Sequence, residues 1–422
     1  MKRNFLTSLP WHDELRKQLN GQNLPVFREA NGHIHTPYSF SAFDSMDTIF
    51  KMAKEEGIAA LGINDFFVTD GYEAFHDGCT GNNIFPLFNI EFIGLLKEEQ
   101  KAGIRINDPN NPGRIYFSGK GLDYPYNLSW TLKRTLKRVI SQSQNQIKAM
   151  IDRLNQIIYP VNPSLKLTYE TIKKRFAKDL VRERHLAKAI RFLALENYDS
   201  PESQISFIES LYGGKKSKTV MSDQSGLENE IRSVLLKAGG AAFVPEDESS
   251  FPDLRKLTEI IKRAGGIPCY PVLLDDPSGK LTEFEADREK LFTSLSSMGI
   301  GCIELIPGRN DISVLKPFCE FFSEKGFIIT FGTEHNTPEL TPLTITARGK
   351  TPLDDSMKKI AWEGVCVIAA HQYLRAHDRQ GYLLDDGSLS LSQKKDLTHL
   401  GGLVIEYFLN RKKYESGNKR PN

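Results

Sequence analysis

Two histidines stand two residues apart in the stretch NGHIHTPYSFSAF, residues 31–43. The segment before them, LPVFREA, has the mixed apolar and charged pattern of a strand. Alternate side chains of a strand lie on one face, so His33 and His35 are predicted to point the same way and to grip one ion. His-x-His pairs also arise by chance, and a metal ion usually takes four or more ligands. The pair is therefore a candidate metal site that needs partners from elsewhere in the chain.

Such partners must come from other strands, and the chain contains two groups of apolar strand patterns interleaved with helical patterns. This alternation is typical of parallel β-α units, and glycines at or near the helix ends mark the boundaries. The first group comprises strands near 25–35, 58–65 and 84–92 with helices near 44–57 and 71–79; the second comprises strands near 266–272, 301–307 and 327–335 with helices near 251–266, 283–299 and 311–326.

A long stretch between the two groups has few strand signals. Its helical patterns cover about 127–158, 168–197 and 202–211. We expect a helical insertion into one α/β barrel, because two independent domains would leave the first group as a small sheet with exposed edges. The expected units are residues 1–124 and 244–350 for the two halves of the barrel, 125–243 for the basic insertion, and 351–422 for C-terminal helices that pack on the barrel.

Positive charge is concentrated in this insertion. The whole chain has a net charge of +2, whereas residues 125–218 hold 18 Lys and Arg against 8 Asp and Glu. The insertion lacks the aromatic-rich basic strands of proteins that bind single-stranded nucleic acid, so we expect no nucleic-acid partner. No apolar run has the length of a signal-peptide core or a membrane span, and the five cysteines have no C-x-x-C spacing. We therefore expect a cytoplasmic protein with reduced thiols and no membrane partner.

Polar residues recur where the predicted strands end. In a parallel barrel these ends meet on one face, which carries the chemistry. Each residue alone is more often an ordinary loop residue, but their recurrence at the same end favours a site. The residues are His33, His35, Asn64, Asp65, Glu91, Tyr270, Glu304, Glu334, His335 and Asn336.

The order and spacing of these blocks resemble the PHP (polymerase and histidinol phosphatase) domain family over about residues 25–120 and 245–340. The resemblance rests on HIHTPYS, GINDFFVTDG, NIEF, RIYFSGKG, GGIPCYP, IELIPGRN and FGTEH. It implies the fold class α/β, as a distorted TIM-like (β/α)7 barrel with an α-helical insertion, which binds up to three metal ions and hydrolyses phosphoesters. The insertion segment LTYETIKKRFAKDLVRERHLAKAI resembles the helical cap of nucleotide-type PHP phosphatases, with Glu183 in place of a proline.

Departures from the family pattern fall on metal ligands. Phe66, Tyr116 and Tyr270 stand where the family has histidines, and the last motif has Glu334 for aspartate and His335 one place early. Phe cannot bind a metal, and a neutral Tyr is a poor ligand. We therefore expect one divalent ion (Zn, Mn or Fe) rather than three, bound by the family positions that remain: His33, His35, Glu91 and Glu334.

The expected reaction is hydrolysis of a small phosphorylated or otherwise anionic substrate by a water molecule that the ion activates. The candidate catalytic residues are Asp65, Glu334 and His335. The candidate substrate-binding residues are Tyr116, Arg182, Arg184, His185, Tyr270, Arg309 and Asn336. Two alternatives stay open: a catalytically weak or inactive barrel that binds a small ligand, and a scaffold that binds a protein partner.

Overall fold

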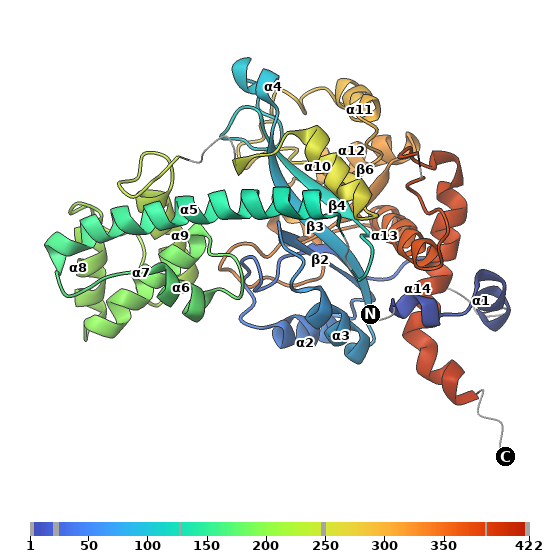
Figure 1. Cartoon of the computed structure of the whole chain (residues 1–422), viewed down its shortest axis with the longest axis horizontal. Coiled ribbons are helices and arrows are strands. Elements are labelled where there is room, and N and C mark those ends of the chain that lie inside the picture. Colours follow the sequence, from blue (N-terminus) through green and yellow to red (C-terminus); the bar gives the residue numbers. More distant parts are fainter. Residues whose placement is uncertain (1–3, 20–24, 126–127, 246–249, 385, 418–422) are drawn as a thin grey trace.

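Seven strands form one sheet in the order of the sequence (Figure 1). The computed structural model describes residues 4–19, 25–125, 128–245, 250–384 and 386–417. A parallel bridge between Ile34 and Glu334 links the two outer strands, so the sheet is a nearly closed barrel of the expected α/β class. The strands are β1 (Ala30–Ile34), β2 (Ala60–Phe66), β3 (Phe85–Leu95), β4 (Arg114–Lys120), β5 (Ile267–Pro271), β6 (Cys302–Leu305) and β7 (Ile328–Phe331).

Strand β4 runs against the others. It pairs antiparallel with β3 and with β5, whereas the remaining pairs in the sheet are parallel. The expectation of an all-parallel barrel is therefore wrong for this strand. Ser118 and Lys120 of β4 both contact Glu304 of β6, so the face of β4 that carries alternate residues 116, 118 and 120 points into the barrel.

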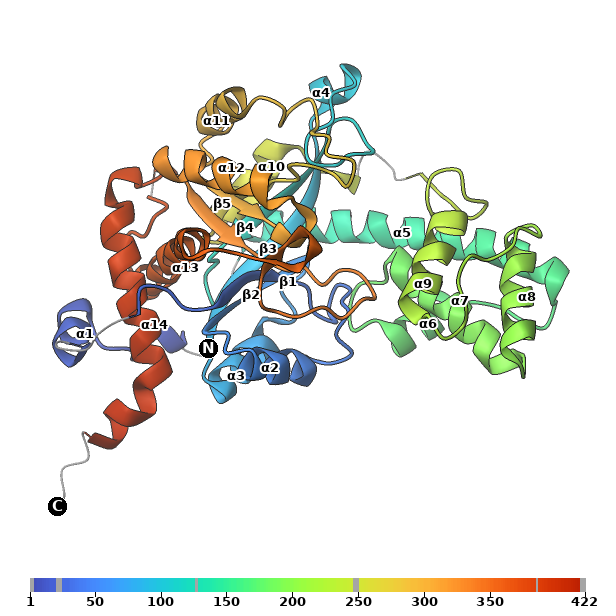
Figure 2. The ribbon, with the colours of Figure 1, turned by 180° about the vertical axis from the view of Figure 1, so that it is seen from behind.

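Helices cover the outside of the barrel (Figure 2): α2 (Met46–Glu55), α3 (Tyr72–Asn82), α10 (Leu254–Arg263), α11 (Arg288–Ser297), α12 (Ile312–Glu324) and α13 (Asp355–Ala376). Five of them begin at a side chain that accepts a backbone hydrogen bond from the first turn, namely Ser45, Asp253, Asp287, Asp311 and Asp354. In α10 the buried residues follow helical spacing along one face, at 254, 257, 260 and 261. These signals explain why the helices begin where the sequence predicts.

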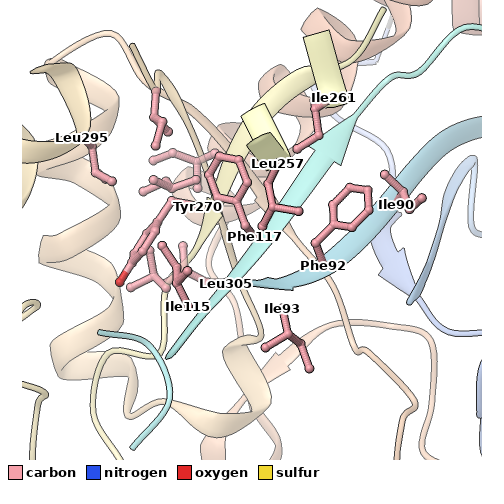
Figure 3. Packing of buried hydrophobic residues seen from close by; sticks show 14 of the residues in the cluster. Ile90, Phe92, Ile93, Ile115, Phe117, Leu257, Ile261, Tyr270, Leu295 and Leu305 are labelled. Atoms are coloured by element: carbon pink, nitrogen blue, oxygen red, sulfur yellow. The ribbon is translucent and has the colours of Figure 1, made fainter. Parts of the chain in front are cut away.

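The largest apolar cluster lies between the sheet and these helices. Figure 3 shows part of it, with Phe92, Phe117 and Tyr270 from the strands beside Leu257 and Ile261 of α10. Burial of each such large side chain contributes roughly 1.5–3 kcal/mol to folding. The cluster holds in place the strands that carry the candidate site.

The expected insertion region forms a helical layer to one side of the barrel (Figures 1 and 2). Its helices are α5 (Trp130–Val161), α6 (Tyr169–Phe176), α7 (Glu183–Asn197), α8 (Pro201–Leu211) and α9 (Gln224–Ile231). The pattern over 168–197 is two helices rather than one, and α9 was not expected. Leu132 and Val139 of α5 belong to the barrel cluster, whereas Ile147 and Leu154 belong to a separate cluster inside the insertion. The exact boundaries at 125 and 243 stay a prediction.

Residues after the barrel form α13 and α14 (Lys394–Gly417), which pack against each other, with α1 (His12–Leu19) beside α14 (Figure 2). All five cysteines are free and buried. Within the described parts of the chain, none of the helices is both long and apolar enough to cross a bilayer.

Candidate metal centre

The four predicted metal ligands converge. His33 is in β1, His35 directly follows it, Glu91 is in β3, and Glu334 follows β7. Each offers one ligand atom, and these atoms all lie within 4.8 Å of one another. All four residues are buried. The structure therefore brings together the set that the family resemblance implied.

Backbone contacts between β1 and the loop after β7 hold this arrangement. The Glu334 N–H donates to the His33 carbonyl (2.9 Å), and the His35 N–H donates to the Glu334 carbonyl (2.7 Å). Gly332 permits the approach, because a Cβ there would lie 2.3 Å from the Cβ of His33. Glu334 and His335 both have left-handed backbone, with φ of 65° and 57°, a costly conformation for non-glycine residues.

Hydrogen bonds fix which nitrogen of each imidazole carries the proton. His33 Nδ1 donates to the Glu304 carboxylate (2.8 Å), so His33 Nε2 carries a lone pair. Ser39 Oγ donates to Asp65 (2.6 Å) and therefore accepts from His35 Nδ1 (3.3 Å). His35 Nε2 also carries a lone pair. These are the tautomers in which both histidines offer Nε2 to a metal.

Three acceptor atoms then face one another, and the Asn64 amide also contacts His33 Nε2 (3.1 Å). The two Nε2 atoms are 3.3 Å apart, and Glu91 Oε2 lies 3.1 Å from that of His35 and 3.6 Å from that of His33. Glu91 Oε2 is buried and has no hydrogen-bond partner. Two nitrogens that bind a tetrahedral Zn ion at about 2.0–2.1 Å are themselves about 3.3 Å apart. The donor set fits a divalent cation, which would relieve this repulsion.

The ionisation states also suit a cation. Burial lowers the pKa of His33 and holds that of His35 well below its ordinary value, so both rings are neutral at pH 7. Burial raises the pKa of Glu91 to about 7, against the opposing charges of Lys120 and Arg309. A bound cation favours the carboxylate form of Glu91 and so restores its negative charge.

Behind His33 lies a buried ion pair that the sequence analysis did not include. Lys120 is fully buried, and its Nζ donates to Glu304 and to Asn64 Oδ1 (3.2 Å). Burial raises the pKa of Glu304, but the charge of Lys120 and the hydrogen bonds from His33 and Lys120 outweigh it, so the pKa lies below its ordinary value. Glu304 is thus an ionised carboxylate that orients His33. Strand alternation could have predicted the position of Lys120, because residues 116, 118 and 120 lie on the same face of β4.

Asp65 has a different position from that expected of a general base. Its two oxygens accept from the Thr36 N–H (2.7 Å), the Thr36 hydroxyl (2.5 Å) and the Ser39 hydroxyl (2.6 Å). Burial raises its pKa to about 7. With its oxygens engaged, Asp65 holds the loop after β1 and orients His35 through Ser39. The expected role of Asp65 in receiving a proton from water stays a prediction.

His335 turns away from the predicted ligands. Its Nδ1 contacts the Thr333 hydroxyl (2.8 Å), its Nε2 contacts the Thr341 carbonyl (2.8 Å), and its ring stacks on Phe43 at 4.5 Å between centroids. Both nitrogens are engaged in holding the loop after β7. Of the three catalytic candidates, Glu334 is the one within the ligand group, and the catalytic role of His335 stays a prediction.

Tyr270 and His185 each have partners within the fold. The Tyr270 hydroxyl donates to Glu285 (2.8 Å), and its ring lies fully buried in the apolar cluster of Figure 3. His185 accepts the Arg182 N–H at the start of α7 (2.9 Å) and packs edge-on against Phe40. Burial lowers the pKa of His185 to about 3, so it is neutral. Neither side chain is placed to bind an anionic substrate.

The remaining candidates lie around a pocket between the barrel and the insertion. Tyr116, Arg182, Arg184 and Asn336 line this pocket of about 120 Å³. Its other charged lining residues are Arg114, Glu183, Arg232 and Lys237, so five cations face one carboxylate. Sequence reasoning missed Arg232 and Lys237, which follow the unexpected helix α9.

Phe66 connects this pocket to the ligand group. One face of its ring stacks on His35, with centroids 4.7 Å apart and planes at 17°. The Arg182 guanidinium lies 4.5 Å from the centroid of the same ring. The insertion therefore reaches the site, as expected if it covers the barrel. Arg309, the last candidate, forms an ion pair with Glu334.

Comparisons with known proteins agree with this fold. The family model of the PHP domain matches residues 31–202 of the chain. A proposed metal-dependent phosphoesterase from Bifidobacterium adolescentis has a similar solved structure, with a TM-score of 0.50 and 14% identity over 79% of this chain and 95% of that one. An amidohydrolase from Chromobacterium violaceum, with sulfate bound and no metal, gives a TM-score of 0.43 and 15% identity over 76% and 93% of the two chains. No curated protein matches the chain.

Proposed function

We propose that the chain is a metal-dependent hydrolase that cleaves a phosphoester in a small anionic substrate. The observation that carries the proposal is the meeting of two imidazole lone pairs and an unpartnered buried carboxylate oxygen in one group. A divalent ion held there supplies Lewis acidity, which lowers the pKa of water to about 7 and polarises a phosphoryl oxygen. The match to the PHP domain supports the same class.

One ion, Zn, Mn or Fe, suits the donor set of His33, His35, Glu91 and Glu334. Two imidazoles and two carboxylates are ligands that all three metals accept. Phe66 closes one side of His35 with an apolar ring, which leaves no further donor on that side. We therefore keep the proposal of a mononuclear site rather than a trinuclear one.

The protein's own groups would bind and orient the substrate. Arg309 beside Glu334 and Arg182 beside Phe66 place two guanidinium groups next to the ligand group. Guanidinium groups bind phosphate oxygens with paired, charge-assisted hydrogen bonds. Glu334 is the carboxylate placed to accept a proton, since Asp65 is engaged by Thr36 and Ser39. The cationic pocket supplies the surface for the rest of an anionic substrate.

Metal content tests this proposal first. Protein purified without a His-tag or chelator should contain about one equivalent of Zn, Mn or Fe by elemental analysis, and a His33→Ala/His35→Ala double variant should contain none. The loaded protein should then hydrolyse members of a phosphoester panel. Absence of metal from the wild-type protein after soaking with Zn and Mn would contradict the proposal.

A catalytically inactive barrel that binds a small ligand is the second candidate. The observation in its favour is that the pocket is lined by Phe66 and Tyr116, while the four ligand residues lie outside its lining. Glu91→Gln separates the two functions. A hydrolase should lose metal and turnover together, whereas a metal-free binding protein should keep its affinity for the ligand.

A further inference from the structure

Arg309 occupies a constrained position beside the metal ligands. It ends the short helix Pro307–Arg309 after β6, and its backbone carbonyl accepts a hydrogen bond from the Arg348 guanidinium. The neighbouring Asn310 accepts from the Arg348 N–H (2.9 Å) and donates through Nδ2 to the Leu273 carbonyl (2.9 Å). The backbone is therefore fixed, whereas the side chain of Arg309 is 47% exposed. The guanidinium can change partner without a change in the fold.

Its present partner is a predicted metal ligand. Arg309 Nη2 pairs with Glu334 Oε2, and the side chain of Glu334 is only 11% exposed. The backbone of Glu334 is tied to β1 through His33 and His35, so its carboxylate has little freedom to move away. A guanidinium and a divalent ion would thus use the same carboxylate. Because both are cations, each reduces the affinity of the other for this position.

The charges in the group decide what happens when an ion binds. Each imidazole donates through Nδ1 and offers a lone pair at Nε2, so the negative charge that faces an ion comes from the carboxylates of Glu91 and Glu334. A divalent ion balances both of them. Arg309 then has no uncompensated carboxylate to pair with, while its charge still lies beside the position of the ion. An anion that contacts both the ion and Arg309 would supply the missing counter-charge.

We propose that Arg309 exchanges partners on metal binding: it pairs with Glu334 in the metal-free protein and with a phosphate oxygen of the substrate in the loaded protein. This inference deepens the proposed function and rests on it. The exchange makes the ion and the anion bind cooperatively. By linkage, each should raise the affinity of the other by the same factor, within the usual range of about 5- to 150-fold.

Calorimetric titrations with Mn²⁺ and inorganic phosphate test the exchange. In the wild-type protein, Mn²⁺ should raise the affinity for phosphate. Arg309→Gln should bind Mn²⁺ more tightly without phosphate, because a competing cation is gone, and should lose the coupling to phosphate. Arg105→Gln is the matched control, since Arg105 pairs with Glu283 in an exposed ion pair. It should leave both quantities unchanged.

Weaker Mn²⁺ binding by Arg309→Gln would overturn the inference, because it would mean that Arg309 only positions Glu334. Unchanged coupling in that variant would overturn it as well. A second variant, Glu334→Gln, should release Arg309 and bind phosphate without Mn²⁺ more tightly than the wild-type protein does. If the wild-type protein binds no ion, the proposed function fails, and this metal-free comparison still decides whether Arg309 exchanges partners.

Discussion

At the scale of single residues, the candidate site depends on how His33 is held. Glu304 accepts the Nδ1 proton of His33 and is itself paired with Lys120, and all three side chains are buried. A carboxylate behind a metal-binding histidine fixes both the tautomer and the ring orientation. Metal binding should therefore depend on residues that contact no ion.

Glu304→Gln should weaken Zn binding by about 10- to 100-fold, the usual effect of removing such a partner. His33 and Lys120 both donate to Glu304 Oε2, and Ser118 donates to Oε1; the amide removes the negative charge and replaces one of these two acceptors with a donor. Competition against a chromophoric chelator measures the affinity. Glu228→Gln is the control, because Glu228 is a buried carboxylate paired with Arg191 (2.8 Å) within the insertion. Unchanged affinity in the Glu304 variant would contradict the assigned role.

Lys120 offers a stability test of the same ion pair. Lys120→Met should destabilise the fold by about 3–5 kcal/mol, because it leaves the Glu304 charge buried without its main partner. The double variant Lys120→Met/Glu304→Gln should recover part of that loss, since the buried charge is removed. Urea unfolding of the single and double variants gives the coupling between the two residues. Additive effects would show that the two side chains do not stabilise each other.

Residue patterns predicted the ligands but not their partners. His33 and His35 were found from spacing, and Glu91 and Glu334 from the family resemblance, and the structure brings all four together. Asp65 is hydrogen-bonded to Ser39 and His335 to Thr341. Tyr270 is hydrogen-bonded to Glu285. Which polar group a side chain meets across the fold is not encoded in local spacing. The positions of these three side chains therefore could not be predicted from spacing alone.

At the scale of elements, the segment after β5 is held by one buried carboxylate. Glu285 accepts from the Tyr270 hydroxyl (2.8 Å), the Leu273 N–H (3.1 Å) and the Leu274 N–H (2.7 Å). Leu274 has left-handed backbone with φ of 59°, so the turn needs such contacts to persist. The same segment contacts Asn310 beside Arg309.

Burial raises the pKa of Glu285 from 4.5 to about 7, which predicts a pH dependence of stability. Between these values the folded protein binds a proton that the unfolded chain has released. Stability should therefore fall as pH rises from about 4.5 to about 7, by up to about 3 kcal/mol from this group, and level off above pH 7.

Urea midpoints of the metal-free protein at pH 5 and pH 7 check this expectation. Glu285→Gln should have a smaller difference between the two midpoints than the wild-type protein. Glu283→Gln should keep the wild-type difference, because the Arg105 contact lowers the pKa of Glu283 to about 2. A Glu285 variant with the full wild-type difference would assign the dependence to other buried groups.

Most helices and strands were predictable because their caps and apolar spacing are local. Strand β4 was predictable as a strand but not in direction, since the direction is set by its pairing with β3 and β5. The division of 168–197 into α6 and α7 was missed because both halves have helical spacing. The local residue pattern predicts whether a segment is a helix or a strand. The direction of a strand and the point where a helix is interrupted depend on contacts with other parts of the fold.

At the scale of the whole molecule, the barrel and the helical layer jointly form the cationic pocket. Arg232 and Lys237 both approach Glu183, at 2.9 and 3.4 Å, and line the pocket with Arg182 and Arg184. Burial and the neighbouring cations lower the pKa of Arg184 to about 9. An anionic ligand would relieve this excess of positive charge.

Arg232→Gln/Lys237→Gln should therefore raise KM for the phosphoester that the panel selects, by about tenfold or more, with little change in kcat. The effect should shrink as salt concentration rises. Lys215→Gln/Lys218→Gln removes the same charge from exposed positions of the same helical layer, outside the pocket lining. Equal effects of the two double variants would show that only overall charge matters.

The bridge between Ile34 and Glu334 has a consequence for how the protein folds. It joins the first and last strands of the sheet across about 300 intervening positions, which include the whole helical layer. Contacts of such long sequence separation form late, because the entropy of closing the loop must be overcome first. During synthesis, His33 and His35 leave the ribosome long before Glu334, the last of the four proposed ligands. Capture of an ion by all four ligands can therefore mark the moment when the last strand docks on the first.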